Sequence, residues 1–391
     1  MIISYRDVKK LLFRQLMQYT LYFRRLDYRF LFLLIFMMIM SLLVIASTAQ
    51  VSFYREEKVF FTVPVLRQLG CFILGWGLFF LLSYFDYRNL RKLCPLLYVG
   101  TLVLLVGLFF TEPIQNVRRW YRLPGMGFQV SEYAKVVLVI TLSYFLEKKA
   151  EAMHRLSTLV QVGLLVFIPF LLIVKQPDLG TALVLLPITA VMLYFGGAPK
   201  KVLFFMGIGG LALLGLVVAM FLGVLSHETL KPTMLKVMKE YQYERLNPSN
   251  YHQKAAQIAI ALGGWGGSGW GEAEYTGKHW LPFAETDSVF PALTEQFGFV
   301  GGTAILMVFF GLIYFSFQVT ALAKDLFGRL LSSGIAVYLG IHVIVNVGMM
   351  CGLLPITGVP LPLISYGGSS VMATMAAFGI LQSVYVRRYM F

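Results

Sequence analysis

An acidic side chain stands where a long polar stretch gives way to an apolar one. The polar stretch covers residues 226–288 and ends in the segment WLPFAETDSVFP, which places Asp287 directly before the next apolar run. A carboxylate at the edge of a membrane is costly to keep, so such residues are candidates for function. A positioned carboxylate can act as a general base toward an attacking hydroxyl group. The alternative is that Asp287 only caps the following helix.

Cationic side chains gather in a second polar loop, between the third and fourth apolar runs. Arg118, Arg119 and Arg122 lie there, and guanidinium groups bind phosphate oxygens in a fork-like geometry. They indicate an anionic ligand or, as the plainer alternative, lipid headgroups. Glu132 and Lys135 follow at the start of the next run, where a structural ion pair explains them as well as a ligand contact does.

Two further outer segments have a composition that restricts the backbone. Asp178 follows a proline in KQPDLGTA, where it either contacts a ligand or simply caps the next helix. The segment 352–370 is uncharged and dense in proline and glycine. It predicts a re-entrant or clamping segment, because non-helical backbone at membrane depth must be shielded by protein.

The elements that must position these residues are membrane helices. The chain has 391 residues, of which 58% are hydrophobic and 13% charged, with a mean hydropathy of +0.74, and this balance excludes an ordinary soluble domain. Unpaired backbone groups are not tolerated in lipid, and the apolar runs do not alternate as barrel strands do. We therefore predict an all-α polytopic membrane protein with about ten transmembrane helices. The apolar runs lie near residues 28–48, 62–83, 93–110, 131–146, 157–174, 179–196, 201–225, 289–317, 330–352 and 364–386.

Charge placement predicts the orientation of these helices. The formal net charge is +14, but Lys and Arg gather before the first run and in alternate short loops. This pattern indicates that both termini are cytosolic, and it argues against nucleic acid as the partner. Residues 1–27 read as a basic amphipathic segment on the inner leaflet. Cys71, Cys94 and Cys351 lack the spacing of a disulfide framework or a metal knuckle.

Residues 28–391 form one predicted transmembrane domain, which includes a large extracytoplasmic loop, 226–288, between the seventh and eighth helices. Within this loop, residues 251–262 (YHQKAAQIAIAL) predict a short helix lying flat at the outer surface. The glycine-rich stretch 263–271 then turns the chain toward Asp287. It lacks the GK[ST] ending of a phosphate-binding loop, so a nucleotide site is not expected.

Several motifs in one order make the chain resemble the SEDS family (shape, elongation, division and sporulation), whose members include RodA, FtsW and SpoVE. The resemblance covers nearly the whole chain, and Gly358–Pro362 with Asn346, Gly348 and Met349 is more similar to the RodA branch. Val130, Ser288 and Gln296 depart from the usual pattern. The matching residues are Arg119, Trp120, Gln129, Ser131, Glu132 and Lys135; Pro177 to Thr181; Glu244 to Leu246 and Gln257; Leu281, Pro282, Thr286 and Asp287; and Pro362 with Ser365 to Ser370.

The resemblance implies a peptidoglycan glycosyltransferase that polymerises lipid II, with inversion at the anomeric carbon and release of polyprenyl diphosphate, in cell elongation and shape control. Asp287 is the expected general base. A divalent cation, Mg²⁺ or Mn²⁺, is a candidate cofactor with Asp178 or Glu132 as oxygen ligands, although no residues have diagnostic metal spacing. The expected substrate-binding residues are Arg118, Arg119, Lys135, Arg245, Glu132, Asp178, Gln257 and Ser369.

The resemblance also implies a location and partners. The location is the bacterial cytoplasmic (inner) membrane, and the partners are a class B penicillin-binding protein, other membrane proteins of the elongation complex, and membrane lipids. Two other functions stay open at this point. A flippase for a lipid-linked precursor would also need outer arginines, and a noncatalytic scaffold would only organise cell-wall enzymes. Charges at the outer ends of helices, rather than near the bilayer midplane, favour the enzyme over the transporter.

Overall fold

Every apolar run predicted from the sequence is a helix in the computed structural model of the chain, which describes residues 22–50, 60–113, 117–123, 126–221, 231–232, 235, 243, 247 and 250–389. Within these ranges, seven helices are long and apolar enough to cross a membrane, and α7 is a shorter apolar helix. The prediction of a polytopic helical membrane protein is confirmed. The helices that correspond to the ten predicted apolar runs form the bundle: α2 (Tyr28–Gln50), α3 (Val63–Tyr84), α4 (Leu90–Gly107), α5 (Val130–Lys148), α6 (Leu156–Lys175), α7 (Leu179–Phe195), α8 (Lys200–Phe221), α13 (Val289–Leu322), α14 (Leu326–Met350) and α15 (Gly368–Val386).

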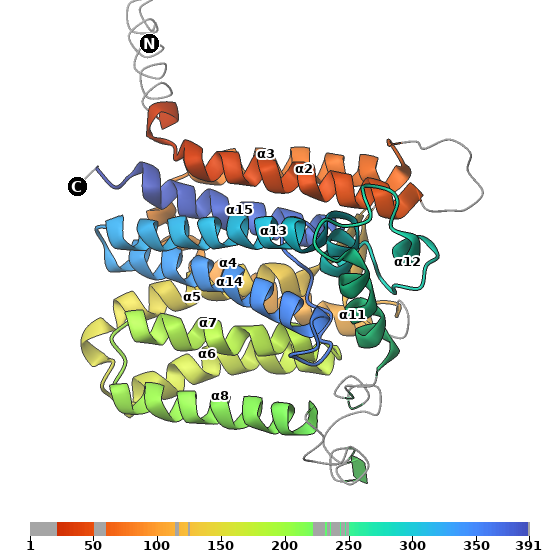
Figure 1. The fold of residues 1–391 in the computed structure, drawn as a ribbon. Coiled ribbons are helices and arrows are strands. Elements are labelled where there is room, and N and C mark those ends of the chain that lie inside the picture. Colours follow the sequence, from red (N-terminus) through yellow and green to blue (C-terminus); the bar gives the residue numbers. More distant parts are fainter. Residues whose placement is uncertain are drawn as a thin grey trace, which may run out of the picture.

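The long helices lie side by side and alternate in direction, so the bundle has two distinct ends (Figure 1). One end carries the start of α2 and the end of α15, and there the Arg388 guanidinium donates to the Arg25 carbonyl (3.4 Å). We call it the termini end. The opposite end, the insert end, carries α11 (Tyr251–Gly263) and α12 (Glu274–Gly277). Helix α11 runs across the bundle rather than along it, which confirms the short surface helix predicted there.

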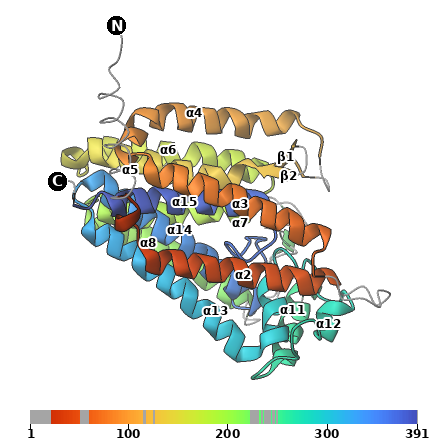
Figure 2. The same ribbon diagram turned by 90° about the horizontal axis from the view of Figure 1, so that it is seen from above.

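Helices α14 and α15 form the centre of the bundle (Figure 2). In the most apolar window of each span, 83% of α15 and 67% of α14 is buried, against 22% for the span that contains α4. Helix α15 packs closely along α3, because Gly379 lets the Phe79 backbone approach where a Cβ would be 2.7 Å from its carbonyl oxygen. Because α14 lies at the centre, most of its side chains face protein.

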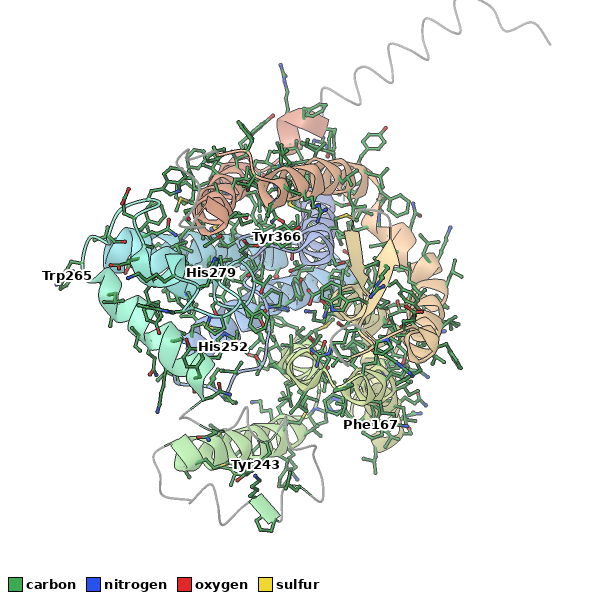
Figure 3. All side chains as sticks on the ribbon, turned by 90° about the vertical axis from the view of Figure 1, so that its right-hand side faces the viewer. Phe167, Tyr243, His252, Trp265, His279 and Tyr366 are labelled. Carbon is green, nitrogen blue, oxygen red and sulfur yellow. The ribbon has the colours of Figure 1, made fainter. Side chains whose placement is uncertain are left out.

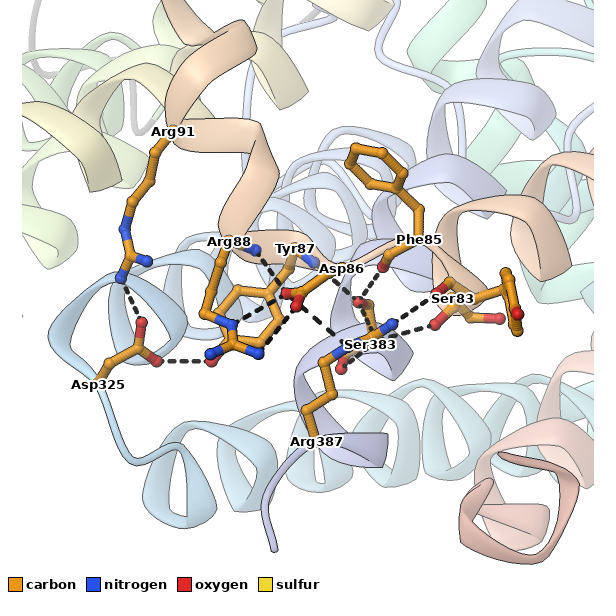
Figure 4. A network of polar contacts seen from close by, with 10 residues as sticks. Ser83, Phe85, Asp86, Tyr87, Arg88, Arg91, Asp325, Ser383 and Arg387 are labelled. Atoms are coloured by element: carbon orange, nitrogen blue, oxygen red, sulfur yellow. Dashed lines mark hydrogen bonds and ion pairs between the residues drawn. The ribbon is translucent and has the colours of Figure 1, made fainter. Parts of the chain in front are cut away.

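Polar side chains join the helix ends at the termini end (Figure 4). Asp325, the residue before α14, accepts a hydrogen bond from the Tyr87 hydroxyl (2.7 Å) and pairs with Arg91 (2.5 Å). Arg91 also binds Glu147 near the end of α5 (2.7 Å). Beside them, Arg387 at the end of α15 donates to the carbonyl of Ser83 (3.2 Å). These bonds hold α3, α4, α5, α14 and α15 together at one end.

A two-stranded antiparallel hairpin is the small exception to the all-helical prediction. Strand β1 (Trp120–Leu123) pairs with β2 (Met126–Gln129), with Trp120 opposite Gln129. Helix α5 begins at the residue after β2. The hairpin therefore fixes where the first turn of α5 lies at the insert end. Short 3₁₀ turns complete the described elements: η1 (Tyr87–Asn89), η2 (Leu108–Phe110) and η3 (Ala150–Ala152).

The glycine-rich stretch after α11 packs directly on the backbone of α13. The amide of Ser268 donates to the Glu295 carbonyl (3.0 Å), and the amide of Phe299 donates to the Gly264 carbonyl (2.8 Å). Gly298 has φ 64 inside α13, where the helix is kinked. A Cβ at Gly267 would be 2.1 Å from the Gln296 carbonyl oxygen, so only glycine permits this approach. The stretch is thus a packed contact rather than the loose connection that glycine content alone allows.

Candidate active site

Asp287 lies at the insert end, in the turn that leads into α13, and the residue is partly exposed. Ser288 is the N-cap residue of α13, so Asp287 lies one residue before the position that the capping alternative gives it. From α14, the Asn346 amide nitrogen donates to the Asp287 carbonyl (3.0 Å) and to the Val359 carbonyl (2.8 Å). The Ser365 hydroxyl donates to the carbonyl of the preceding Thr286 (2.7 Å). The backbone of the acid is therefore held by two separate segments.

The other side of this turn meets α11 and the segment 351–367. Figure 3 looks onto the insert end, where His252 and Tyr366 come from these two elements. The His252 Nε2 lies 2.7 Å from the Ser288 hydroxyl, and the Tyr366 amide donates to the Glu285 carbonyl (2.7 Å). Burial raises the pKa of the Glu285 carboxyl, and the charge of nearby His279 opposes this rise. A carboxyl group with a raised pKa, that of Glu285, thus lies two residues from Asp287.

Lys135 is fully buried on α5, although the sequence leaves an outer ligand contact open for it. Its ammonium lies 2.7 Å from Glu132 Oε1, which confirms the predicted ion pair, and 2.6 Å from His342 Nε2. The His342 imidazole, also fully buried, lies with Nδ1 2.7 Å from the Tyr338 carbonyl oxygen. The cluster therefore joins α5 to α14 inside the bundle.

Arg119 binds the turn before α7. Its guanidinium donates to the carbonyls of Gln176 (3.2 Å) and Pro177, and it lies 3.8 Å from Asp178 Oδ1. Asp178 accepts a hydrogen bond from the Thr181 amide (3.4 Å), so it is the N-cap of α7, as the structural alternative predicts. Arg119 is 15% exposed at its side chain, which leaves a small part of it open to a ligand.

The other expected substrate-binding residues differ in their surroundings. Ser369 is buried, where it donates to the Gly127 carbonyl (2.7 Å) and accepts from the Gln129 amide (2.9 Å), so it anchors the hairpin. Gln257 is exposed and donates to the Cys351 carbonyl (3.4 Å). Arg118 is exposed and donates to a backbone carbonyl. Arg245 lies outside the described residues.

The chain matches the family model described as Cell cycle protein (FtsW/RodA/SpoVE) over residues 28–390. This match spans nearly the whole sequence. The chain belongs to the FtsW/RodA/SpoVE family.

Individual members of the family agree in sequence and fold. The peptidoglycan glycosyltransferase MrdB of Escherichia coli K12 is 31% identical over 335 residues, covering 83% of this chain and 86% of the relative. A chain from a structure on the coordination of polymerization and crosslinking by a peptidoglycan synthase complex is 31% identical, with a TM-score of 0.75 over 94% of this chain and 99% of that one. The rod shape determining protein RodA of Thermus thermophilus is 30% identical, with a TM-score of 0.68 over 93% and 98%.

Glu132 and Asp178, the two expected metal ligands, both have basic partners in the structure. Glu132 pairs with Lys135 and Asp178 faces Arg119, so neither offers the full charge of a carboxylate to a divalent cation. Within the part of the chain that the structure describes, no group of three or more His, Cys, Asp or Glu side chains is placed to hold a metal ion. These two residues do not fit a shared metal site.

Two residues of this site were not predicted from the sequence as functional. His342 and Asn346 lie one turn apart on α14 and contact Lys135 and the Asp287 turn, respectively. Both are polar side chains inside an apolar run, and such residues are rare in membrane helices unless they have a role. That signal was available in the sequence, but their partners lie on other helices. In the sequence, Asn346 served only to favour similarity to the RodA branch.

Proposed function

We propose that the chain polymerises peptidoglycan glycan strands from lipid II at the insert end of the bundle. The relative named a peptidoglycan glycosyltransferase, 31% identical over most of the chain, supports an enzyme of this class. The observation that carries the proposal is the placement of Asp287. The residue is partly exposed, and α14 holds its backbone through Asn346. A proton acceptor that meets a substrate needs both access and a fixed position.

In the proposed reaction, a sugar hydroxyl of one substrate attacks the anomeric carbon of another. The new C–O bond forms on the face opposite the bond to the diphosphate, which breaks, so the configuration at this carbon inverts. Asp287 accepts the hydroxyl proton, and polyprenyl diphosphate leaves with the bonding electrons. General base catalysis of this kind contributes about 10²–10⁴-fold to a rate.

Positive charge favours departure of the diphosphate through electrostatic stabilisation. Arg118 and Arg122 are both exposed in the outer loop, and of the two Arg118 is an expected substrate-binding residue, whereas Arg119 has most of its donors on carbonyls and Lys135 is buried. We therefore assign the first contact with the diphosphate to Arg118, with Arg119 at the edge of the site and Lys135 acting from below. Arg245 remains a predicted contributor. Mg²⁺ or Mn²⁺ remains a candidate cofactor, which would supply further positive charge to the leaving diphosphate.

The proposal gives the molecule an orientation. The insert end faces outward from the bacterial cytoplasmic membrane, and both termini are cytosolic, as the distribution of Lys and Arg predicts. A class B penicillin-binding protein is the proposed partner, and the structural similarity to a chain from a peptidoglycan synthase complex supports an assembly of this kind. A role in cell elongation rests on the similarity of residues 346–362 to the RodA branch.

The test is polymerisation of lipid II by purified protein, with and without the partner. We expect glycan polymer from the wild type and none from Asp287→Asn, whose amide is nearly isosteric but cannot take the proton. Glu274→Gln, which removes a carboxylate charge from an exposed side chain of α12 at the same end, is the control for altered charge. Removal of divalent cations with EDTA, followed by addition of Mg²⁺ or Mn²⁺, tests the metal in the same assay.

The other two functions give different results in this experiment. Equal movement of lipid II across vesicles by wild type and Asp287→Asn, without polymer, would identify a flippase. Neither polymer nor movement, even with the partner present, would leave a scaffold. Polymer from the variant at the wild-type rate would rule out Asp287 as the base.

A further inference from the structure

Lys135, Glu132 and His342 form a charged cluster inside the bundle, and all three side chains are almost completely buried. A charge in a membrane span is costly unless other groups compensate it. The Lys135 ammonium is compensated twice, by Glu132 Oε1 at 2.7 Å and by His342 Nε2 at 2.6 Å. The ion pair alone is local to α5, since the two residues are three positions apart. The imidazole is the hydrogen-bond partner that ties the ammonium to another helix, α14, whose Tyr338 ring centroid also lies 5.6 Å from the ammonium.

The hydrogen bonds of His342 define which nitrogen carries the proton. Nδ1 lies 2.7 Å from the Tyr338 carbonyl oxygen, which can only accept, so Nδ1 is the donor. Nε2 faces the Lys135 ammonium, which can only donate, so Nε2 is the acceptor. The imidazole is therefore neutral. This arrangement directs one ammonium hydrogen toward α14, while another is bonded to Glu132.

The same face of α14 reaches the Asp287 turn. Asn346 lies one helical turn beyond His342, and its amide nitrogen holds the Asp287 carbonyl at 3.0 Å. Among the described residues, two buried acceptors in this region have no hydrogen-bond partner, Glu132 Oε2 and Asn346 Oδ1. Buried polar atoms without protein partners indicate a bound water or ligand group. Helix α14 contacts the buried cation through His342 and the turn of the proposed base through Asn346, so one helix links the two.

We propose that His342 is a positioning residue for the glycosyl transfer, which orients the Lys135 ammonium beneath the Asp287 turn. This rests on the proposed function. The neutral imidazole takes no proton from substrate and touches none; it acts through Lys135. A hydrophobic side chain of similar volume would satisfy the packing at position 342 but would offer the ammonium no acceptor. A misplaced catalytic group can lower a rate by up to about a hundredfold, which sets the size of the expected effect.

The experiment compares His342→Phe, His342→Gln and wild type with the partner present and lipid II as substrate. Phenylalanine keeps a planar ring but has no acceptor, whereas the glutamine amide oxygen can accept from the ammonium at a similar reach. We expect His342→Phe to lower kcat at least about tenfold with little change in KM, and His342→Gln to restore most of it. Ile344→Leu, on the exposed face of α14, is the matched control, and thermal unfolding is measured for each protein.

Two outcomes would overturn the inference. One is a wild-type kcat in a folded His342→Phe protein, and the other is an equal loss in His342→Gln and His342→Phe. A double-mutant cycle with Lys135→Met adds a third check, because His342→Phe should cause no further loss once the ammonium is gone. An inactive wild type would instead refute the proposed function. An active wild type with an unaffected His342→Phe refutes only the role of His342.

Discussion

Asn346 on α14 donates to the carbonyl of Asp287, 59 positions away in the chain, at 3.0 Å. The same amide nitrogen donates to the Val359 carbonyl at 2.8 Å. One fully buried side chain therefore joins the turn before α13 to the irregular segment that follows α14. The position of the proposed base depends on a helix that is already central to the bundle.

Replacing Asn346 should separate positioning of the base from its chemistry. Asn346→Leu removes both hydrogen bonds and leaves two carbonyls unsatisfied, which costs about 1–3 kcal/mol of stability for each buried group. We expect kcat to fall by up to about a hundredfold, with KM nearly unchanged. Polymerisation kinetics and thermal unfolding measure the two effects. Ser332→Ala is the control, because its hydroxyl bonds only to carbonyls of its own helix. Full activity in a folded Asn346→Leu protein would contradict the prediction.

Arg118 and Arg119, two of the three arginines of the outer loop, should respond differently to substitution. Arg119→Ala removes the bonds to the Gln176 and Pro177 carbonyls, so we expect a loss of about 1–3 kcal/mol of stability together with weaker use of lipid II. Arg118→Ala should raise the apparent KM with little change in stability, because this side chain is exposed. Initial rates over a range of lipid II concentrations, with melting curves, distinguish them. Unchanged kinetics in Arg118→Ala would indicate a lipid headgroup contact instead.

The contact between the glycine-rich stretch and α13 predicts a local stability effect. Gly267 has φ 81, and an added Cβ would lie 2.1 Å from the Gln296 carbonyl oxygen. We expect Gly267→Ala to destabilise the protein by at least about 1 kcal/mol, because both the backbone conformation and the space oppose the methyl group. Gly266→Ala is the matched control, since a Cβ there meets nothing within 4 Å. Equal melting temperatures for the two variants would show that the stretch does not pack tightly against α13.

Glu285 predicts a pH dependence of stability. Burial raises the pKa of this carboxyl above its ordinary 4.5 in the folded protein, while His279 opposes the rise. A raised pKa means that the protonated form favours folding, so this contribution is complete below pH 4.5 and is lost as pH rises through the folded value. Glu285→Gln should therefore be more stable than wild type near pH 7, with a smaller difference near pH 4. Melting curves across this range provide the measurement. A difference that does not vary with pH would contradict it, and Glu151→Gln, at an exposed position, is the control.

The helices could be predicted because each needs only its own stretch of sequence. An apolar run of sufficient length forms a helix in lipid whatever lies beside it, and each predicted run is a helix. The place of Asp287 before α13 followed for the same reason. The pair of Glu132 with Lys135 was also local, since residues three apart share a helix face.

The contacts between helices could not be predicted in this way. Nothing in the sequence places His342 beside Lys135, 207 positions earlier, because the crossing of α5 and α14 depends on the packing of the whole bundle. Likewise, the composition of the outer loop indicated an anion site, yet Arg119 uses backbone carbonyls as its acceptors. The residue type alone does not distinguish an arginine that binds backbone carbonyls from one that binds phosphates. The fold determines which of these acceptors lies near the guanidinium.

The buried cluster of Lys135, Glu132 and His342 also restricts how the sequence can evolve. Loss of any one member leaves a buried charge or donor without its partner. A variant that has lost one member is therefore less stable than its ancestor. A descendant that exchanges the imidazole must gain another acceptor there at the same step. Position 342 is therefore free to change identity among acceptors, but it is closed to the aliphatic residues that surround it on α14.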